Sequence, residues 1–488
     1  MTIKNIQIIT MTRRFLLSAL LCLIPVLGLA GKKETGVKVI PYPSSVEIGK
    51  GQFKGAGALF SCENSIDGQS ITAIRSFAER IALISGRSSS VAVPAGNLKK
   101  AVEEAKVKGF FFLKDESLAK EAYSIKISKR SCIVRASDHN GFIYALETLK
   151  QLTDPAIFGE EIDGSQMFYF PCVEISDAPR ISDRAIRLDC SRHFWSVEEV
   201  KRVLDIMSVY KLNRFFWHLS DDQGWRLEIK QFPKLTEIGA FRNGTMVGQD
   251  FNSNDGIRHG GFYTREQVKD IIAYAYERGI DVIPEIELPG HTSAILAAYP
   301  ILSCAGEGDF EVKTTWGVFD STICPGKEMT YSFLEGVFNE IVDLFPCDYV
   351  SIGTGECPHT EWKDCPDCQS AIRNLDLKGE GDRSAEDLLQ DYMVSRLEAF
   401  LTSRGRKIAS REEVDLEAVC GSDKVQPSLW TEYVSTPEDL ETLLLPQLTA
   451  LSEILWCDPQ SRDEARYQSS LQNESVRIFK EMGYNYKK

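Results

Sequence analysis

The sequence lacks an excess of basic residues: 56 Lys and Arg stand against 70 Asp and Glu, which gives a net charge of -14 at pH 7. Nucleic-acid binding depends on clustered Lys and Arg, so this balance argues against nucleic acid as the main partner. No G-x-G-x-x-G loop follows a predicted strand, so the signature of a nucleotide-binding open sheet is also missing. A neutral or polar small-molecule substrate fits this composition better.

Long apolar runs are confined to the N-terminus. Arg13 and Arg14 precede the apolar stretch Phe15 to Ala30, which ends in small residues suited to cleavage. At about 16 residues the stretch is shorter than the roughly 20 that span a bilayer, which favours a signal peptide over a membrane anchor. We therefore expect a signal peptide at 1–30, no membrane span, and an exported protein that is secreted or periplasmic.

The thirteen cysteines allow disulfides, because an exported chain can oxidise them. Cys304 with Cys324, and Cys365 with Cys368, are candidate pairs, although sequence does not give connectivity. Cys357-x7-Cys365-x2-Cys368 resembles a zinc-ligand spacing but lacks a fourth ligand of matching spacing. We therefore expect no metal and no cofactor.

The length of 488 residues suggests more than one domain. Residues 37–175 carry mixed signals: 122–135 predicts two strands around Lys129 and Arg130, and 141–152 has helical spacing. This region is predicted to be a small α+β companion domain. From about residue 180 to 488 the pattern changes to a repeated strand, loop and amphipathic helix, which predicts a parallel sheet.

The alternating region favours a closed (β/α)8 barrel of TIM type, within the α/β class. Polar residues follow the ends of successive strands, where a barrel brings them to one face and builds its active site. The predicted strands cover 185–189, 214–219, 281–287, 348–353, 407–410 and 427–430. The polar residues that follow them are Asp189, Asp221, Asp222, Glu285, Glu287 and Glu356.

Carboxylic acids and aromatic rings on one rim indicate glycoside hydrolysis, in which an acid protonates the leaving oxygen. His291, just beyond a Pro-Gly turn, either tunes the pKa of such an acid or is a structural histidine. Four tryptophans either stack on a sugar or belong to the core. They are Trp225, Trp362, Trp430 and Trp456.

Five motifs, in order, resemble the β-N-acetylhexosaminidases of glycoside hydrolase family 20. The resemblance runs from about residue 180 to the C-terminus, and the preceding α+β segment is similar to that family's companion domain. The motifs are Arg184-Ala-Ile-Arg-Leu-Asp-Cys-Ser-Arg-His-Phe194, Trp217-His-Leu-Ser-Asp-Asp-Gln-Gly-Trp225, Pro284-Glu-Ile-Glu-Leu-Pro-Gly-His291, Glu356-Cys-Pro and Leu429-Trp-Thr-Glu-Tyr433.

The resemblance implies a substrate-assisted mechanism on glycans that contain N-acetylhexosamine. The sugar's acetamido oxygen attacks the anomeric carbon, and an Asp-Glu pair polarises the acetamide and protonates the leaving group. It implies that Glu356 is the general acid and base, with Glu287 and His291 in the network behind it. The implied substrate-binding residues are Arg184, Asp222, Trp430 and Glu432.

The fourth strand departs from the family pattern His-Ile-Gly-Gly-Asp-Glu. The chain reads Ser351-Ile-Gly-Thr-Gly-Glu356, so Gly355 stands where the polarising Asp is expected and Thr354 replaces a glycine. Glycine has no carboxylate, and removing one such preorganised group typically costs about 10²–10³ in kcat.

A second departure lies downstream, where Arg411 aligns with a pocket tryptophan. Only residues 414–429 separate Glu413 from Trp430, and neither a second pocket tryptophan nor the family's Tyr-x-Asp is found there. A barrel strand is therefore shortened or missing. These losses favour either a hydrolase of reduced activity or a non-catalytic carbohydrate-binding descendant, a pseudoenzyme. Metal-dependent hydrolysis has no ligand cluster behind it, and the oligomeric state stays open.

Overall fold

The computed structural model of this chain describes residues 36–94, 98–103, 108–162, 164–353, 355–409 and 427–487. The predicted signal peptide, Thr354 and the segment 410–426 with Arg411 lie outside the described residues. Among the described helices, none combines the length and apolar character that crossing a membrane requires.

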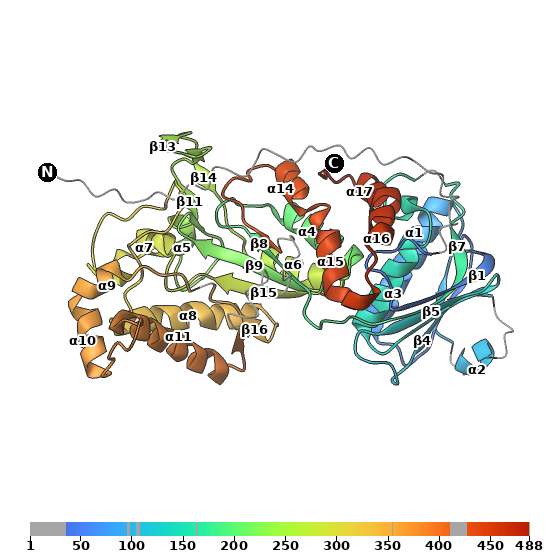
Figure 1. Cartoon of the computed structure of the whole chain (residues 1–488), viewed down its shortest axis with the longest axis horizontal. Coiled ribbons are helices and arrows are strands. Elements are labelled where there is room, and N and C mark those ends of the chain that lie inside the picture. Colours follow the sequence, from blue (N-terminus) through green and yellow to red (C-terminus); the bar gives the residue numbers. More distant parts are fainter. Residues whose placement is uncertain are drawn as a thin grey trace, which may run out of the picture. The chain divides into compact units, whose positions relative to one another are not determined.

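The N-terminal half builds one mixed seven-stranded sheet in the order β1-β7-β5-β6-β4-β2-β3, with α1 packed on α3 (Figure 1). The two strands expected around residues 129–130 are the antiparallel pair β5 and β6, and the expected helix is α3. The strands are β1 Ser45–Lys54, β2 Phe60–Cys62, β3 Val91–Ala92, β4 Gly109–Lys114, β5 Tyr123–Ile127, β6 Ser131–Ala136 and β7 Tyr169–Asp177. The helices are α1 Gly68–Ser85, α2 Leu98–Glu103, α3 His139–Gln151 and the short η1 Pro155–Ile157.

The second half is a series of parallel strands in the order β18-β8-β9-β15-β16-β17 (Figure 1). A parallel bridge between Glu285 and Ser351 joins β15 to β16. The predicted shortened strand would fall between β17 and β18, outside the described residues, and stays a prediction. The strands are β8 Ala185–Asp189, β9 Arg214–Asp221, β15 Asp281–Ile286, β16 Tyr349–Val350, β17 Lys407–Ile408 and β18 Ser428–Leu429.

Helices alternate with these strands, and their first residues explain where they begin. Ser196 before α4 and Thr264 before α6 each form a two-way capping box, with Glu199 and Gln267 respectively, which satisfies the free N–H groups of the first turn. The helices are α4 Val197–Val209, α5 Lys234–Glu237, α6 Arg265–Tyr276, α7 Ser293–Ala298, α8 Glu328–Leu344, α9 Thr360–Asp364, α10 Pro366–Asn374, α11 Ala385–Ser403, α14 Pro437–Leu444, α15 Gln447–Trp456, α16 Glu464–Ser470 and α17 Val476–Glu481.

Several short elements complete the second half. A stretch of short strands lies between β9 and α6 and surrounds α5. These strands are β10 Gly224–Trp225, β11 Phe241–Arg242, β12 Met246–Val247, β13 Asp250–Asn254 and β14 His259–Gly260, and the remaining turns are η2 Pro300–Leu302, η3 Pro459–Ser461 and η4 Leu471–Ser475.

Buried ion pairs join the seven-stranded sheet to the parallel strands. Arg184, just before β8, is fully buried, and its guanidinium group lies 3.0 Å from Glu121 and donates to the carbonyl of Lys211. Lys211 in turn lies 3.1 Å from Asp177, at the end of β7. Buried charges need such partners because desolvation costs several kcal/mol per ion. This cluster therefore ties the two halves of the chain together.

We predict that Arg184→Met lowers the free energy of unfolding by about 3–5 kcal/mol, since it leaves Glu121 buried without its cation. Urea unfolding at pH 7 measures the change. Arg130→Met, in the exposed turn between β5 and β6, is the control and should stay within about 0.5 kcal/mol. Equal losses in the two variants would contradict a structural role for the Arg184 ion pair.

Candidate active site

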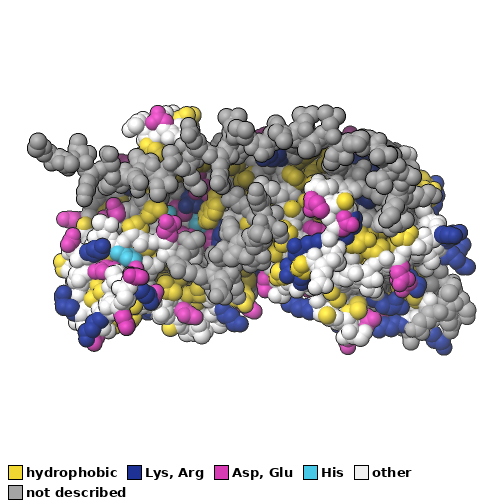
Figure 2. All heavy atoms as spheres, viewed as in Figure 1, with side chains coloured by type: hydrophobic (Ala, Val, Ile, Leu, Met, Phe, Trp, Pro, Cys, Tyr) yellow, Lys and Arg dark blue, Asp and Glu magenta, His cyan; other side chains and the backbone are white. Residues whose placement is uncertain are grey.

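The carboxyl ends of β8, β9 and β15 carry a set of buried acidic side chains, as the sequence predicted. All of them are at most 2% exposed, which is unusual for carboxylates without partners. Figure 2 shows basic and histidine side chains gathered on the face below β13. The buried acids are Asp189, Asp221, Asp222, Glu285 and Glu287.

Alternating charges run across the strands as one hydrogen-bonded chain. Arg187 on β8 lies 2.8 Å from Glu285 on β15, and Glu285 lies 2.8 Å from Nδ1 of His218 on β9. The other ring nitrogen of His218 is 3.0 Å from Asp221, whose carboxylate also lies 2.9 Å from Arg192. Each buried charge therefore has an opposite charge on at least one side, as burial requires.

This chain of charges fixes protonation states. Burial alone would lower the pKa of His218, but hydrogen bonds to Asp221 and Glu285 raise it to about 10. Burial would raise the pKa of Glu285, but Arg187 and His218 lower it to about 2. The pKa of Asp221 is likewise held well below its usual range by Arg192 and His218, against the effect of burial. The two carboxylates are ionised and His218 is a cation at neutral pH.

His291 extends this network toward solvent. Its Nδ1 lies 2.9 Å from Asp222 and 3.3 Å from Asp221. These carboxylates raise the pKa of His291 to about 11, against the opposite effect of burial. Its Nε2 lies 3.8 Å from the carboxylate of Glu356. The structure thus brings together His291 and Glu356, as the family resemblance implied.

Asp222, which the resemblance assigned to substrate binding, lies behind His291 in this structure. The Asp222 carboxylate is 1% exposed and accepts hydrogen bonds from the backbone N–H and the hydroxyl of Ser293, in addition to its contact with His291. Asp222 therefore positions the His291 ring, and its contact with a sugar stays a prediction.

Glu356 is the exposed member of the network: 62% of its side chain is accessible. Two features hold its loop against the His291 turn. A Cβ at Gly290 would lie 1.9 Å from the backbone oxygen of Glu356, so only glycine permits this approach. Gln390 on α11 donates to the carbonyl of Gly355 at 2.6 Å. The position of Glu356 therefore depends on β15, β16 and α11 together.

Glu287 lies in the middle of the network, 3.9 Å from His218. Burial, together with the neighbouring carboxylates Glu285 and Asp221, raises the pKa of Glu287. A Cβ at Gly353 would come within 1.9 Å of the Glu287 carboxylate. The glycine that begins the Gly353-Thr-Gly-Glu run therefore makes room for this acid.

Arg192, Trp430 and Glu432 form one side of the site, beside these acids, and we call these three residues the Arg192 wall. The ring of Trp430, just past β18, lies 5.1 Å from the guanidinium of Arg192, and Glu432 lies 3.9 Å from that guanidinium. Burial raises the pKa of Glu432. Trp430 and Glu432, both predicted to bind substrate, therefore lie together with Arg192 at the carboxyl ends of the strands.

Arg192 is the residue that sequence reasoning missed. Asp189 ends β8 and accepts hydrogen bonds from the backbone N–H groups of Ser191 and Arg192, which turns the chain at the rim. The prediction that Arg184 grips sugar hydroxyls was wrong, because Arg184 precedes the same strand and is fully buried at its opposite end. The available signal was position: Arg192 follows the strand, whereas Arg184 precedes it.

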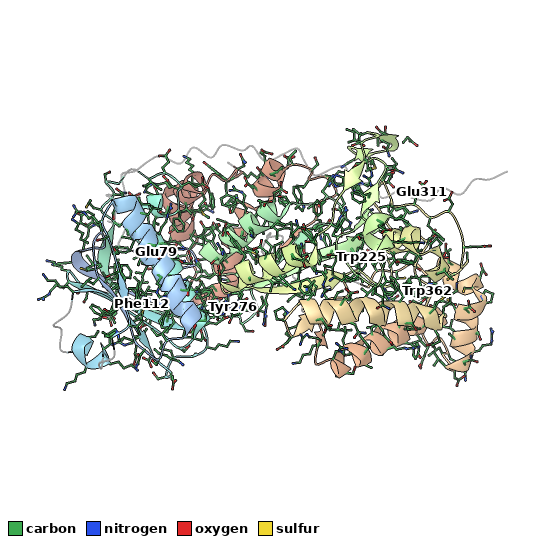
Figure 3. All side chains as sticks on the ribbon, turned by 180° about the vertical axis from the view of Figure 1, so that it is seen from behind. Glu79, Phe112, Trp225, Tyr276, Glu311 and Trp362 are labelled. Carbon is green, nitrogen blue, oxygen red and sulfur yellow. The ribbon has the colours of Figure 1, made fainter. Side chains whose placement is uncertain are left out.

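Three of the four candidate stacking tryptophans are core residues. Trp225, Trp362 and Trp456 are at most 1% exposed. Figure 3 labels Trp225 near the green strands and Trp362 among the orange helices. Only Trp430 of these four is partly accessible.

Two groups in this network hold three potential metal ligands each: His218 with Glu285 and Glu287, and His291 with Asp221 and Asp222. In both groups the imidazole nitrogens point at carboxylates, and one carboxylate of each group pairs with an arginine: Glu285 with Arg187, and Asp221 with Arg192. The arrangement fits proton transfer and hydrogen bonding to a polar ligand. Gly355 adds no side chain to it, while Thr354 and Arg411 lie outside the described residues.

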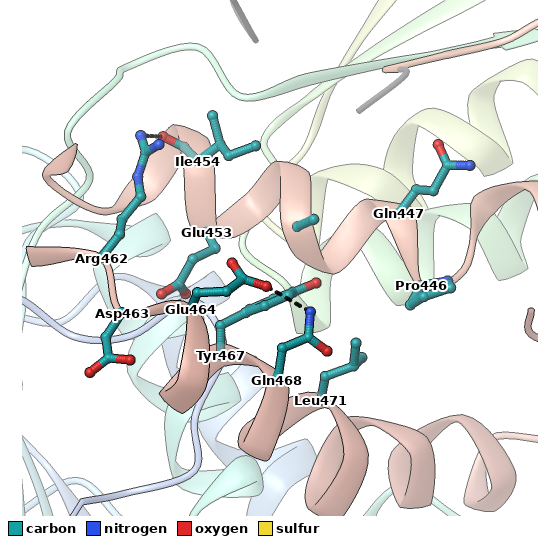
Figure 4. A pocket seen from close by; sticks show the side chains of 11 residues that line it. Pro446, Gln447, Glu453, Ile454, Arg462, Asp463, Glu464, Tyr467, Gln468 and Leu471 are labelled. Atoms are coloured by element: carbon teal, nitrogen blue, oxygen red, sulfur yellow. Dashed lines mark hydrogen bonds between the residues drawn. The ribbon is translucent and has the colours of Figure 1, made fainter. Parts of the chain in front are cut away.

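A separate pocket of about 400 Å³ lies between α15 and α16 (Figure 4). Its lining includes Glu453, Arg462 and Tyr467, and none of its lining residues belongs to the charged network described above. Glu453 already pairs with Arg466. The pocket therefore adds nothing to the chemistry of the candidate site.

Comparisons with known proteins point to one family. The profile of glycosyl hydrolase family 20, catalytic domain, matches residues 182–426, and that of domain 2 of the same family matches residues 36–178. A beta-hexosaminidase of Porphyromonas gingivalis is 40% identical over 301 residues, which cover 61% of this chain and 36% of that protein. One of Vibrio furnissii is 38% identical over 297 residues, covering 61% and 46%. The matches thus span less than half the length of these curated relatives.

Solved structures agree. A GH20 exo β-N-acetylglucosaminidase of Vibrio harveyi, in complex with N-acetylglucosamine, superposes with a TM-score of 0.75 at 26% identity, over 92% of this chain and 78% of that one. A β-N-acetylhexosaminidase of Bacteroides fragilis gives 0.72 at 28% identity, over 92% and 96%. These likenesses confirm the predicted α/β fold, a TIM-type barrel preceded by a small domain.

We predict that the free energy of unfolding falls as pH rises from 7 to 8. His218 and His291 have folded pKa values of about 10 and 11, above the usual value, so their stabilisation is complete below about pH 6.5 and is lost as pH rises toward those values. Two such groups contribute about −2.7 kcal/mol per pH unit, and ionisation of cysteines in the unfolded chain makes the total slope steeper.

Urea unfolding across this range measures the slope. His291→Asn keeps a side chain that tolerates the positive φ of 54° and should make the slope less steep by about 1.4 kcal/mol per pH unit. A slope near zero in the unmodified protein would exclude charged histidines in the folded state.

Proposed function

Because this chain belongs to glycosyl hydrolase family 20, we propose that it removes terminal β-linked N-acetylglucosamine or N-acetylgalactosamine from glycans, at a reduced rate. The observation that carries the proposal is the pairing of Glu356 with His291, 3.8 Å apart, in front of two buried aspartates. A general acid needs a carboxyl group that the substrate can reach and neighbouring groups that orient it. Glu356 is accessible, and His291 with its two aspartates lies beside it.

The proposed reaction proceeds in two steps. The acetamido oxygen of the bound sugar attacks C1, the bond from C1 to the glycosidic oxygen breaks, and Glu356 gives its proton to that oxygen. Glu356 then takes a proton from water as the water attacks C1 and reopens the oxazolinium ring. The β configuration is retained because the anomeric carbon is attacked twice.

The relay behind Glu356 supports this alternation of acid and base. His291 is cationic because Asp221 and Asp222 raise its pKa. A cation near the Glu356 carboxylate stabilises the charge that remains after the proton has left. Arg192 and His218 hold Asp221 in place, so the charged chain keeps the relay oriented.

The sugar is proposed to bind against the Arg192 wall. The guanidinium group of Arg192 offers planar paired donors that suit neighbouring hydroxyls, and Glu432 beside it accepts hydrogen bonds. The accessible face of Trp430 suits the apolar face of a pyranose. Arg192 takes the role that the resemblance gave to Arg184, while Trp430 and Glu432 keep their predicted roles.

The rate is proposed to be low because Gly355 provides no carboxylate to the acetamide N–H. The positive charge that develops on the oxazolinium then lacks a fixed partner, which typically costs about 10²–10³ in kcat. The same observation favours a second candidate function, in which the chain binds terminal N-acetylhexosamine without turning it over. The N-terminal apolar run further suggests that either activity is exerted outside the cytoplasm, in the periplasm or the medium.

We predict that Gly355→Asp raises the turnover of a chromogenic aryl β-N-acetylglucosaminide at least tenfold, because it restores a carboxylate next to Glu356. Gly355 has a φ of 70°, which aspartate tolerates better than most residues. Release of the aryl leaving group, recorded at saturating substrate, gives the comparison.

The matched variant Glu356→Gln should abolish turnover in both backgrounds, whereas Glu361→Gln on α9 should leave it unchanged. Turnover of the unmodified chain within tenfold of the Gly355→Asp variant would show that position 355 does not limit the rate. Activity that survives Glu356→Gln would remove Glu356 as the acid. Binding of N-acetylglucosamine with no turnover in any variant would favour the second candidate function.

A separate prediction concerns recognition of the sugar. Arg192→Met should weaken the binding of N-acetylglucosamine at least tenfold in calorimetry, since charged hydrogen bonds contribute about 1.5–3 kcal/mol. Arg130→Met, which is remote in an exposed turn, serves as the control. Unchanged affinity in Arg192→Met would move the sugar away from the Arg192 wall.

A further inference from the structure

Four cysteines that lie far apart in the sequence meet outside the candidate active site. Cys304 follows η2, Cys324 lies before α8, and Cys365 and Cys368 border the N-terminus of α10. Their sulfur atoms all lie within 4.8 Å of one another. We call this group the four-cysteine cluster. It was not predicted from the sequence, which suggested two separate pairs and a spacing that used Cys357.

The distances between the sulfurs are those of a metal-thiolate site. Cys324 lies 3.5 Å from Cys368 and 3.7 Å from Cys365, and Cys304 lies 3.9 Å from Cys368. A tetrahedral zinc ion with four Zn–S bonds of about 2.3 Å holds its sulfurs about 3.8 Å apart. A disulfide brings two sulfurs to about 2.05 Å. The cluster therefore has the dimensions of a coordination sphere.

The surrounding chain is shaped for this approach. A Cβ at Gly326 would lie 2.3 Å from the backbone of Asp367 and Cys368, so glycine is needed where the two cysteine-bearing loops meet.

The cluster is also enclosed. Cys324 and Cys368 are fully buried and Cys365 is 3% exposed, while Cys304 is partly accessible. Buried Trp362 packs with these cysteines in one apolar cluster, among the orange helices of Figure 3. The dry surroundings and four protein ligands leave no coordination position for water, which is the mark of a structural site.

We propose that the four-cysteine cluster binds one Zn²⁺ in a closed tetrahedral thiolate site. The ion replaces the expectation that the chain binds no metal. Its binding releases the thiol protons and forms four Zn–S bonds, so no oxidant or reductant is involved. The proposal goes beyond the glycosidase assignment and does not depend on turnover.

The site joins the loops that carry the relay to Glu356. Cys324 donates its backbone N–H to Leu302, and the neighbouring Ile323 donates to the hydroxyl of Thr292, the residue after His291. The helices α9 and α10 follow the Glu356 loop, and the ring of His359, just before α9, stacks on Trp362 with the ring centres 4.7 Å apart. Zinc at the cluster thus fixes the loops after β15 and β16 to one point.

The test is elemental analysis of the full chain, purified without chelator. We expect about one zinc per chain. Alkylation under denaturing, non-reducing conditions with chelator present should modify all four cysteines of the cluster. Replacement of zinc by Co²⁺ should give thiolate-to-cobalt charge transfer and the visible bands of a tetrahedral ion. These three readouts use the unmodified chain, so they do not depend on the folding of a variant.

The variant Cys365→Ser/Cys368→Ser should lower the zinc content at least tenfold and lower the melting temperature. Cys357→Ser is the matched control, because Cys357 lies close in sequence but its sulfur donates to the carbonyl of Pro358 instead. Zinc below a tenth of an equivalent in the unmodified chain, iron in its place, disulfides between the four cysteines, or equal zinc loss in the control would each overturn the proposal.

Discussion

The alternating chain of charges inside the parallel strands is the constraint on which the rest of the site depends. It runs from Arg187 through Glu285, His218 and Asp221 to Arg192, and it uses three neighbouring strands. A lone buried charge costs several kcal/mol, so a shift in strand register would leave at least one member unpaired. The packing of the strands and the protonation of the site are therefore set by the same contacts.

This dependence also explains why the site tolerates little change behind Glu356. Gly290 lies too close to the backbone of Glu356 for any side chain to fit between them. Gly353 lies equally close to the carboxylate of Glu287. Gln390 reaches the same loop from α11. Gly355 lies in the same loop but contributes no side chain to these contacts, so the buried network does not depend on a side chain at that position.

Sequence reasoning recovered the elements whose signals are local. Helical spacing over residues 141–152 marked α3, and polar residues after apolar strands marked the rim. It misplaced the sugar-binding arginine although a signal was present, because Arg192 follows its strand and Arg184 precedes it. It failed outright where the answer depends on three-dimensional position. The four-cysteine cluster joins residues up to 64 positions apart, which no spacing pattern encodes.

The buried ion pairs that join the two halves bear on how this protein can be divided. The seven-stranded sheet supplies the acids Glu121 and Asp177, and the parallel strands supply the bases Arg184 and Lys211. A cut near residue 180 would separate each of these acids from its base. All four groups would then lack the partners that they have in the whole chain. The boundary between the two matched family domains therefore lies where buried charges of one domain depend on partners in the other.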